Sequence, residues 1–301
     1  MNGRLRIALV APFLDEAEHL PTFLASVAAQ ERRPDRLLLV DDGSTDGSGA
    51  LAESFAARHE WVSVGRRPAR RVGRDRLAGG SALRAFAWGV ERLAEPWDVV
   101  AKVDADLRLT PATLRTLERA FVRDPQLGLA GAFLSVRERD GRLVRQRLPR
   151  EHVEGETKFY RRACWDDIAP LPEMVGWDTV DVMRARRAGW RTESFDMPDG
   201  DPEHLRPMGM RDGRLRAYRR WGRCAWSFGE HPLHVVAVAV QRAGDRPPLL
   251  GGANYVAGWA MAAVTRAPRA EPELIAYVRD DTLRRVRRRA ARSVRSIGAR
   301  P

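Results

Sequence analysis

Residues 99–108 constrain the fold more than any other stretch of this chain. Val99 to Val103 is an apolar run rich in β-branched residues, and it leads into Asp104 and Asp106, two carboxylates one residue apart. Such a run predicts a buried strand, and open parallel sheets bind ligands just beyond the carboxyl ends of their strands. Residues at i and i+2 of an extended segment point the same way, so both carboxylates can face one cation or one ligand. On these ten residues alone, an acidic strand end that only faces solvent is an equal alternative.

The residues before this run alternate between predicted strands and helices. We expect strands over 4–10, 37–40 and 61–64, and helices over 19–30, from Ser44 or Thr45 as a cap to about 57, and over 81–93. This alternation is typical of a parallel sheet with right-handed crossovers. Asp41 and Asp42 follow the second strand, so we expect them at the same sheet edge as the later pair. Two acidic clusters at one edge favour a binding site over solvent-facing acids.

The second half of the chain predicts a mixed sheet. We expect a helix over 110–121, a strand over 128–136, a hairpin turn over 138–141 with a returning strand over 143–148, further helices from 165 and over 179–188, and a short strand over 192–195. Gly189 is the expected cap of the last helix. A long loop follows from 199 to 213.

Size and charge limit the class of protein. A chain of 301 residues suits one large α/β domain or one domain with an appendage. The formal net charge is +12, and residues 266–301 hold eleven arginines and four acids, so the basic character belongs mainly to the C-terminal end. Two cysteines form no metal-binding or disulfide pattern, and we expect no secretory signal, so a cytoplasmic enzyme is the simplest class. We expect a catalytic domain over 1–225, with halves 1–108 and 109–225, and a helical region over 226–301.

The acidic turns and a basic loop together predict a nucleoside-diphosphate site. The Asp42 carboxylate can accept a hydrogen bond from a base N–H, and Ser44 can fix that turn. Asp104 and Asp106 can bind a divalent cation, which neutralises a diphosphate leaving group. The loop over 66–80 carries arginines that can bind the same phosphates, namely Arg71, Arg74 and Arg76. A solvated face is the alternative for each of these arginines.

Two later segments supply candidates for a base and for further ligands. Asp178 opens a predicted helix, whose dipole keeps a carboxylate ionised, and Trp177 can form a platform for a sugar ring. Asp178 as a helix N-cap is the alternative, and the two roles can coexist. His204 can give a neutral imidazole to a metal and Arg206 a guanidinium to phosphate. A lone histidine is more often structural.

These pieces, in this order, resemble an inverting family 2 glycosyltransferase with a GT-A fold. Each motif alone is weak, whereas the ordered set, which covers about residues 4–210, is specific. The matching pieces are the first strand with Pro12 and Glu16, residues 40–46, Asp104 to Asp106, residues 155–162, and residues 176–178 followed by a helix that ends at 188–190.

The resemblance implies a fold, a reaction and roles for single residues. The fold is a Rossmann-like, mostly parallel central sheet with a helical C-terminal extension. Asp42 would contact the base, Asp104 the ribose or metal, and Asp106 the metal, which is Mg²⁺ or Mn²⁺. Asp178 would deprotonate the acceptor hydroxyl for direct displacement, with inversion, at the anomeric carbon. The expected nucleotide-sugar contacts are Pro12, Glu16, Asp42, Ser44, Arg74, Arg76, Asp104, Trp177 and Arg206, and His204 is the candidate third metal ligand.

Three positions depart from the family pattern. Leu14 and Asp15 replace a Tyr-Asn pair, which alters base recognition. Trp177 replaces the Glu of a Glu-Asp pair. Residues 79–81 read Gly-Gly-Ser where a Gly-Lys pair is common, so phosphate contacts must come from elsewhere.

The C-terminal quarter predicts contact with a membrane surface. Residues 247–265 are uncharged, but four polar or glycine positions lower their hydrophobicity, so we expect a buried or interfacial helix, with a membrane span as the alternative. Residues 283–297 place apolar residues at helical spacing between arginines, which suits anionic lipid headgroups. Nucleic acid is a rival partner, although aromatic residues for stacking are missing there. A solvated tail is the third possibility.

We therefore expect a metal-dependent glycosyltransferase that moves a sugar from a nucleoside diphosphate to a hydroxyl acceptor in cell-envelope polysaccharide or glycolipid assembly. A glycan or lipid-linked acceptor and a cytoplasmic location, with peripheral attachment to the inner face of the membrane, follow from this expectation. A nucleotidyltransferase is the second enzyme class, but residues 11–16 lack the Gly-rich basic loop that it needs. The third hypothesis is a non-catalytic basic protein that binds membranes or nucleic acid.

Overall fold

The computed structural model describes residues 4–67, 80–138, 140–146, 148–206, 213–244 and 248–297. The chain packs as two compact units. The first comprises Met1–Glu173 and Arg184–Met208, and the second Met174–Met183 and Gly209–Pro301. The expected boundary between 225 and 226 stays a prediction, since this division falls near residue 208 and assigns a short segment of the catalytic region to the second unit.

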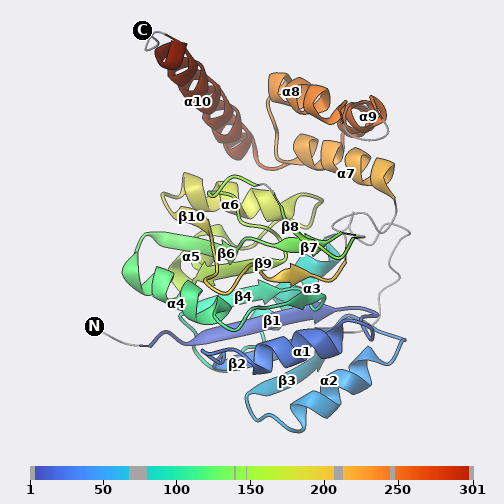
Figure 1. The fold of residues 1–301 in the computed structure, drawn as a ribbon, viewed down its shortest axis with the longest axis vertical. Coiled ribbons are helices and arrows are strands. Elements are labelled where there is room, and N and C mark those ends of the chain that lie inside the picture. Colours follow the sequence, from blue (N-terminus) through green and yellow to red (C-terminus); the bar gives the residue numbers. More distant parts are fainter. Residues whose placement is uncertain are drawn as a thin grey trace. The chain divides into compact units, whose positions relative to one another are not determined.

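A seven-stranded sheet forms the centre of the first unit (Figure 1). Its spatial order is β10-β6-β9-β4-β1-β2-β3, and only β9 runs antiparallel to its neighbours. The expected mixed, mostly parallel sheet is therefore confirmed. The strands are β1 (Ile7–Phe13), β2 (Arg36–Asp41), β3 (Val62–Arg66), β4 (Val99–Val103), β6 (Leu127–Ala132), β9 (Thr157–Arg161) and β10 (Arg191–Phe195).

Helices cover both faces of this sheet. On one face, α1 (Leu20–Ala28), α2 (Ser48–Ala56) and α4 (Thr113–Arg123) bury their apolar sides in a core with alternate residues of β1, such as Leu9. On the other face lie α3 (Ser81–Val90) and α5 (Arg162–Ile168). Here Gly89 of α3 lies so close to Val10 and Val40 that a Cβ would overlap their methyl groups. Helix α6 (Trp177–Arg187) begins in the second unit and ends in the first.

A small second sheet corrects part of the sequence interpretation. Its order is β5-β11-β7-β8, formed by β5 (Leu107–Arg108), β11 (Glu203–His204), β7 (Ser135–Arg137) and β8 (Leu143–Arg145). The single strand expected over 128–136 is two strands, β6 and β7, in different sheets. The expected hairpin is confirmed as β7–β8, whereas β9 and β11 were not predicted.

The expected cap of α2 is wrong. Gly47, with φ +93°, is the N-cap residue, and the first N–H of the helix, that of Ser48, donates to Asp46 and not to Ser44 or Thr45. The left-handed backbone at Gly47 begins the helix three residues after Ser44, so that Ser44 and Thr45 belong to the preceding loop.

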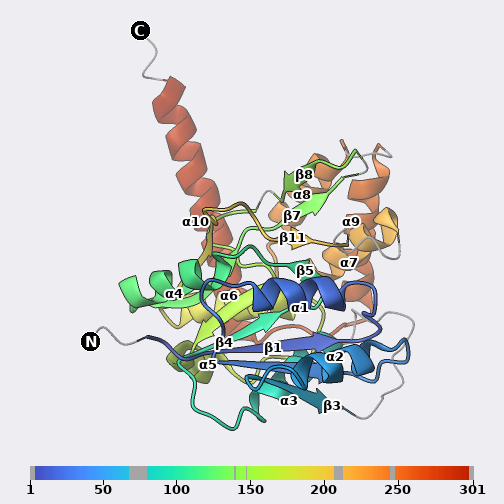
Figure 2. The same ribbon diagram turned by 60° about the horizontal axis from the view of Figure 1, so that its bottom comes forward.

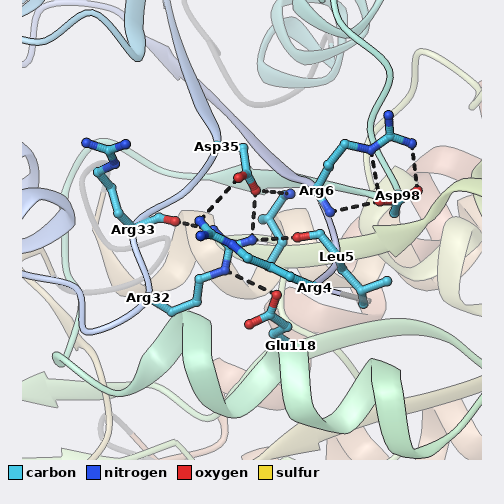
Figure 3. A network of polar contacts seen from close by, with 9 residues as sticks. Arg4, Leu5, Arg6, Arg32, Arg33, Asp35, Asp98 and Glu118 are labelled. Atoms are coloured by element: carbon cyan, nitrogen blue, oxygen red, sulfur yellow. Dashed lines mark hydrogen bonds and ion pairs between the residues drawn. The ribbon is translucent and has the colours of Figure 1, made fainter. Parts of the chain in front are cut away.

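Ion pairs hold the amino ends of three central strands (Figure 3). Arg6 donates through its backbone and its guanidinium to Asp98, which precedes β4. These hydrogen bonds hold the pKa of Asp98 below its ordinary value. Arg32, of which only 7% of the side chain is exposed, pairs with Asp35 before β2 and, at 3.2 Å, with Glu118 of α4. These charged groups thus lie at the amino edge of the sheet, opposite the carboxyl edge where we predict the site.

The second unit is helical, with α7 (Arg214–Ser227), α8 (Pro232–Arg242), α9 (Leu250–Val264) and α10 (Pro272–Ile297). Figure 2 shows α7, α8 and α9 grouped together. Helices α7 and α9 meet through glycines: a Cβ at Gly222 would overlap the carbonyl oxygen of Tyr255, and one at Gly258 that of Arg219. Among the described residues, no helix has both the length and the apolar character needed to cross a membrane. The helix expected over 283–297 is confirmed as part of α10.

Candidate active site

The loops after β1 and β2 are joined by side-chain hydrogen bonds. The Asp41 carboxylate accepts from the backbone N–H groups of Gly43 and Ser44, which turns the chain sharply at the end of β2. Ser44 Oγ then accepts from Asp15 N at 3.1 Å, and Ser48 Oγ accepts from Glu16 N at 2.9 Å. These contacts fix the backbone on which the predicted donor-binding residues stand, at the carboxyl edge of the sheet.

Asp42 lies in the same turn and pairs with Arg67, just beyond β3. Both side chains are 13% exposed. Burial raises the pKa of Asp42 in spite of the arginine. Arg67 was not singled out in the sequence, where it was one of many arginines in a basic loop. Its ion pair fixes the orientation of the carboxylate that we predict to bind the base.

Asp106 lies in a cluster that the β5–β11 pairing assembles. His204 of β11 is the register partner of Leu107, so its ring comes beside the acidic turn. His204 Nε2 lies 3.4 Å from Asp106 Oδ2. Arg206 Nε lies 4.0 Å from the same oxygen, and Arg206 also pairs with Glu16 from the loop after β1. Four residues predicted from distant parts of the sequence are therefore brought together.

The charges within this cluster shift the pKa values of Asp106 and His204. Burial favours a neutral Asp106, but the hydrogen bond with His204 and the charges of His204 and Arg206 prevail and hold its pKa below the ordinary value. Burial also opposes a charged imidazole, yet Asp106 raises the pKa of His204. Only a neutral imidazole can ligate a metal, so a cation at His204 would have to compete with a proton that Asp106 favours.

Asp104 has a partner that the sequence analysis missed. Lys102, only 2% exposed, pairs with Asp104 and donates to the carbonyl oxygen of Gly155 at 2.7 Å. Burial nevertheless raises the pKa of Asp104. The available signal was a lysine inside an apolar strand, in a chain that has only two lysines. The other, Lys158, is its direct cross-strand neighbour on β9 and is also buried.

The donor set fits a divalent cation only in part. Asp106 and His204 converge; the carboxylate suits Mg²⁺ or Mn²⁺, whereas the imidazole favours a transition-metal ion such as Mn²⁺ over Mg²⁺. In the part of the chain that the structure describes, no group of three or more His, Cys, Asp or Glu side chains is arranged to hold a metal. A magnesium-type site commonly takes one or two protein ligands and completes its shell with substrate phosphates and water. The residues present fit that kind of site.

The remaining predicted residues are not part of this cluster. Arg74 and Arg76, like Arg71, lie outside the described residues. Trp177 and Asp178 belong to the second unit, in the first turn of α6. Within that unit, the charge of Asp178 adds to burial in raising the pKa of Cys224 on α7. Their roles as platform and base stay predictions. Pro12 lies in β1 opposite Val40 of β2, next to the joined loops.

A mostly parallel sheet with an acidic carboxyl edge and a partly buried Asp-X-Asp turn is typical of nucleotide-sugar transferases with the GT-A architecture. The model of the family "Glycosyl transferase family 2" matches residues 8–171. The chain belongs to this family, and it is a glycosyltransferase.

Individual relatives agree with this assignment. The chain is 28% identical over 264 residues to the undecaprenyl-phosphate mannosyltransferase of Micrococcus luteus, covering 87% of this chain and 93% of the relative. It is 30% identical over 131 residues to the polyprenol monophosphomannose synthase of Mycolicibacterium smegmatis, 43% of this chain and 46% of the relative. In fold it is similar to the mannosyltransferase PcManGT of Pyrobaculum calidifontis, solved with GDP-Man and Mn²⁺, with TM-score 0.55, 18% identity, and coverage of 91% and 79%.

Proposed function

We propose that this glycosyltransferase transfers a sugar from a nucleoside diphosphate to an acceptor oxygen with inversion, assisted by a divalent cation. The observation that carries the proposal is the convergence of Asp106, His204, Arg206 and Glu16 at the carboxyl edge of the sheet. Asp106 and His204 would hold the cation, which when bound supplies positive charge to the leaving diphosphate. Arg206 is placed to add charge-assisted hydrogen bonds there, and Asp42 would orient the base.

The reaction proposed is a single displacement. An acceptor oxygen forms a bond to the anomeric carbon while the bond from that carbon to the β-phosphate oxygen breaks, and the nucleoside diphosphate leaves with the electron pair. One displacement inverts the anomeric centre. Where the acceptor is a hydroxyl, its proton passes to a base, for which Asp178 is the proposed residue.

We further propose that the acceptor is lipid-linked and used in cell-envelope assembly, by a cytoplasmic enzyme at the inner face of the membrane. The support comes from the relatives, whose names specify undecaprenyl phosphate and polyprenol. Their acceptors raise a second candidate reaction, transfer to a phosphate oxygen of the lipid. A phosphate oxygen is already ionised at neutral pH and needs no base.

The cation assignment is tested by Asp106→Asn. We expect titration calorimetry with GDP-mannose to show Mn²⁺-dependent binding in the wild type and a loss of at least about tenfold in affinity in the variant, because one of two protein ligands is gone. Asp196→Asn, which removes an exposed carboxylate paired with Arg145 and Arg150, is the matched control. Equal binding by D106N and wild type would exclude Asp106 as the ligand.

The base is tested by Asp178→Asn with the two acceptor classes. For a hydroxyl acceptor, we expect donor binding to persist while transfer falls by about a hundredfold or more. For a polyprenyl phosphate acceptor, the same variant should keep most of its turnover. Full transfer to a hydroxyl acceptor by D178N would show that another group takes the proton.

A further inference from the structure

Large apolar side chains are exposed together on one part of the second unit. Among the residues whose exposure the structure describes, thirteen large hydrophobic ones are exposed, and eight of these lie on α8, α9 or the turn that precedes α9. They are Leu233, Val236, Val240, Leu249, Leu250, Val256, Met261 and Val264. Single exposed apolar residues are common on protein surfaces, whereas a cluster of this kind marks an interaction site.

The spacing of these residues gives each helix one apolar outer side. On α8, Leu233, Val236 and Val240 are three and four residues apart, while Val235 between them is buried. On α9, Leu250, Met261 and Val264 are exposed at 46%, 61% and 82%. We call the eight residues listed above the α8–α9 face.

Helix packing explains why this face was not evident in the sequence. The glycines that lower the hydrophobicity of residues 247–265 point inward. A Cβ at Gly252 would overlap the carbonyl oxygen of Ala239 in α8, and Gly258 lies against Arg219 in α7. The small residues are thus used for packing, and the outer side of α9 keeps the larger apolar ones with no charged residue between 249 and 265.

The charge carried by α7, α8 and α9 is almost entirely positive. Among the described residues between 214 and 266, there are seven arginines and one acid, Glu230, which pairs with His234. Arg242 lies over the ring of Trp221 at 4.5 Å and near Tyr255. Arginine and aromatic side chains beside an apolar face are typical of the boundary between lipid headgroups and acyl chains.

We propose that the α8–α9 face docks on the surface of an anionic lipid bilayer, with both helices lying in the headgroup region. A helix of 15 residues is about 22 Å long, shorter than the roughly 30 Å hydrocarbon core, so α9 rests on the bilayer and does not cross it. The inference deepens the proposed function, since it rests on a lipid-linked acceptor that brings the enzyme to a membrane. It assigns the docking to α8 and α9, not to the basic helix α10.

The test is co-sedimentation of the full chain with phosphatidylcholine vesicles, with and without phosphatidylglycerol. We expect wild-type protein to bind the anionic vesicles, and Leu233→Asp with Met261→Asp to weaken this binding by at least about tenfold, since each substitution removes the burial of one apolar side chain. Both positions are more than half exposed, at 70% and 61%, so the variant can fold.

Two matched variants place the same new charge elsewhere. Val122→Asp, at a residue 51% exposed on α4 of the first unit, should bind like wild type. Val286→Asp, 55% exposed on α10, should keep most of the binding. Equal binding by the double variant and V122D would overturn the proposal, and so would loss of binding in V286D alone. A dimer without vesicles that the double variant dissociates, with no vesicle binding by wild type, would show that a second copy of the chain covers the face.

Donor binding, measured in solution on the same variants, separates this proposal from the proposed function. Wild type that binds vesicles but no nucleotide sugar would refute the proposed function and leave the docking surface in place. Wild type that binds the donor with Mn²⁺ but no vesicles would refute the docking surface alone.

Discussion

Glu154→Gln is expected to remove a large pH dependence from the stability of this protein. Glu154 stands in the loop before β9, next to the glycine whose carbonyl accepts from Lys102. It is 3% exposed, and neither carboxyl oxygen has a hydrogen-bond partner among the described residues. Burial, with the charges of Glu156 and Asp201, raises the pKa of Glu154 to about 9.

The sign and size of the effect follow from this pKa. The folded chain holds a proton that the unfolded chain, with an ordinary pKa of 4.5, releases. The contribution of Glu154 to stability is therefore complete below pH 4.5 and is lost as the pH rises to about 9. Each pH unit in that window costs about 1.4 kcal/mol, so the loss reaches about 3 kcal/mol at pH 7.

The assay is urea unfolding of wild type and E154Q at a series of pH values. The glutamine cannot titrate, so the unfolding free energy of E154Q minus that of wild type should increase by about 1.4 kcal/mol per pH unit between about pH 5 and 9. A constant offset from the amide does not affect this slope. Glu138→Gln, in the β7–β8 turn where the side chain is 51% exposed, controls for the change in net charge. A difference that stays flat with pH would refute the assignment of a neutral, buried Glu154.

Two further substitutions test the packing of each unit. Arg32→Met should lower the unfolding free energy by about 3 kcal/mol, because it leaves the partly buried carboxylates of Asp35 and Glu118 without their shared cation. Arg36→Met, which breaks an exposed pair, should cost less than about 1 kcal/mol. Equal losses of the two variants in urea unfolding would contradict a stabilising role of the Arg32 ion pairs. Gly258→Ala should lower the stability of the second unit by about 2 kcal/mol, because the new methyl group overlaps the carbonyl oxygen of Arg219. Gly244→Ala, whose Cβ has its nearest neighbour at 3.6 Å, is the control in thermal unfolding, and a similar loss there would rule out helix contact as the cause.

The parallel part of the fold was predictable because its strands have clear local sequence patterns. The strands from β1 to β4 are short, mostly apolar runs, and the segments between them have apolar residues at helical spacing. Such local patterns can be recognised without knowledge of tertiary contacts. Strands β5 and β11 have two residues each, and they exist only because residues 107 and 204 meet in the fold. A strand of two residues is too short to show a hydrophobic periodicity, so the sequence around them does not predict a strand.

The candidate site was predictable in its acids and not in its partners. Asp106 and His204 were selected as metal ligands, and their side chains do converge, although the sequence could not show that a two-residue strand brings them together. Lys102 was overlooked because its neighbours are apolar and a strand pattern tolerates one long side chain. Glu154 was overlooked because an acid in a polar loop predicts exposure, and only the packing of the loop buries it.

The burial of both lysines limits how this chain can react with chemical labels. Every other basic side chain that carries permanent charge is an arginine, and both lysines lie inside the central sheet. The side chains of this chain therefore offer amine-reactive dyes, cross-linkers and acylating agents no exposed amine. Agents selective for guanidinium groups would instead modify it extensively, so a lysine introduced at an exposed position would be the one side-chain amine open to labelling.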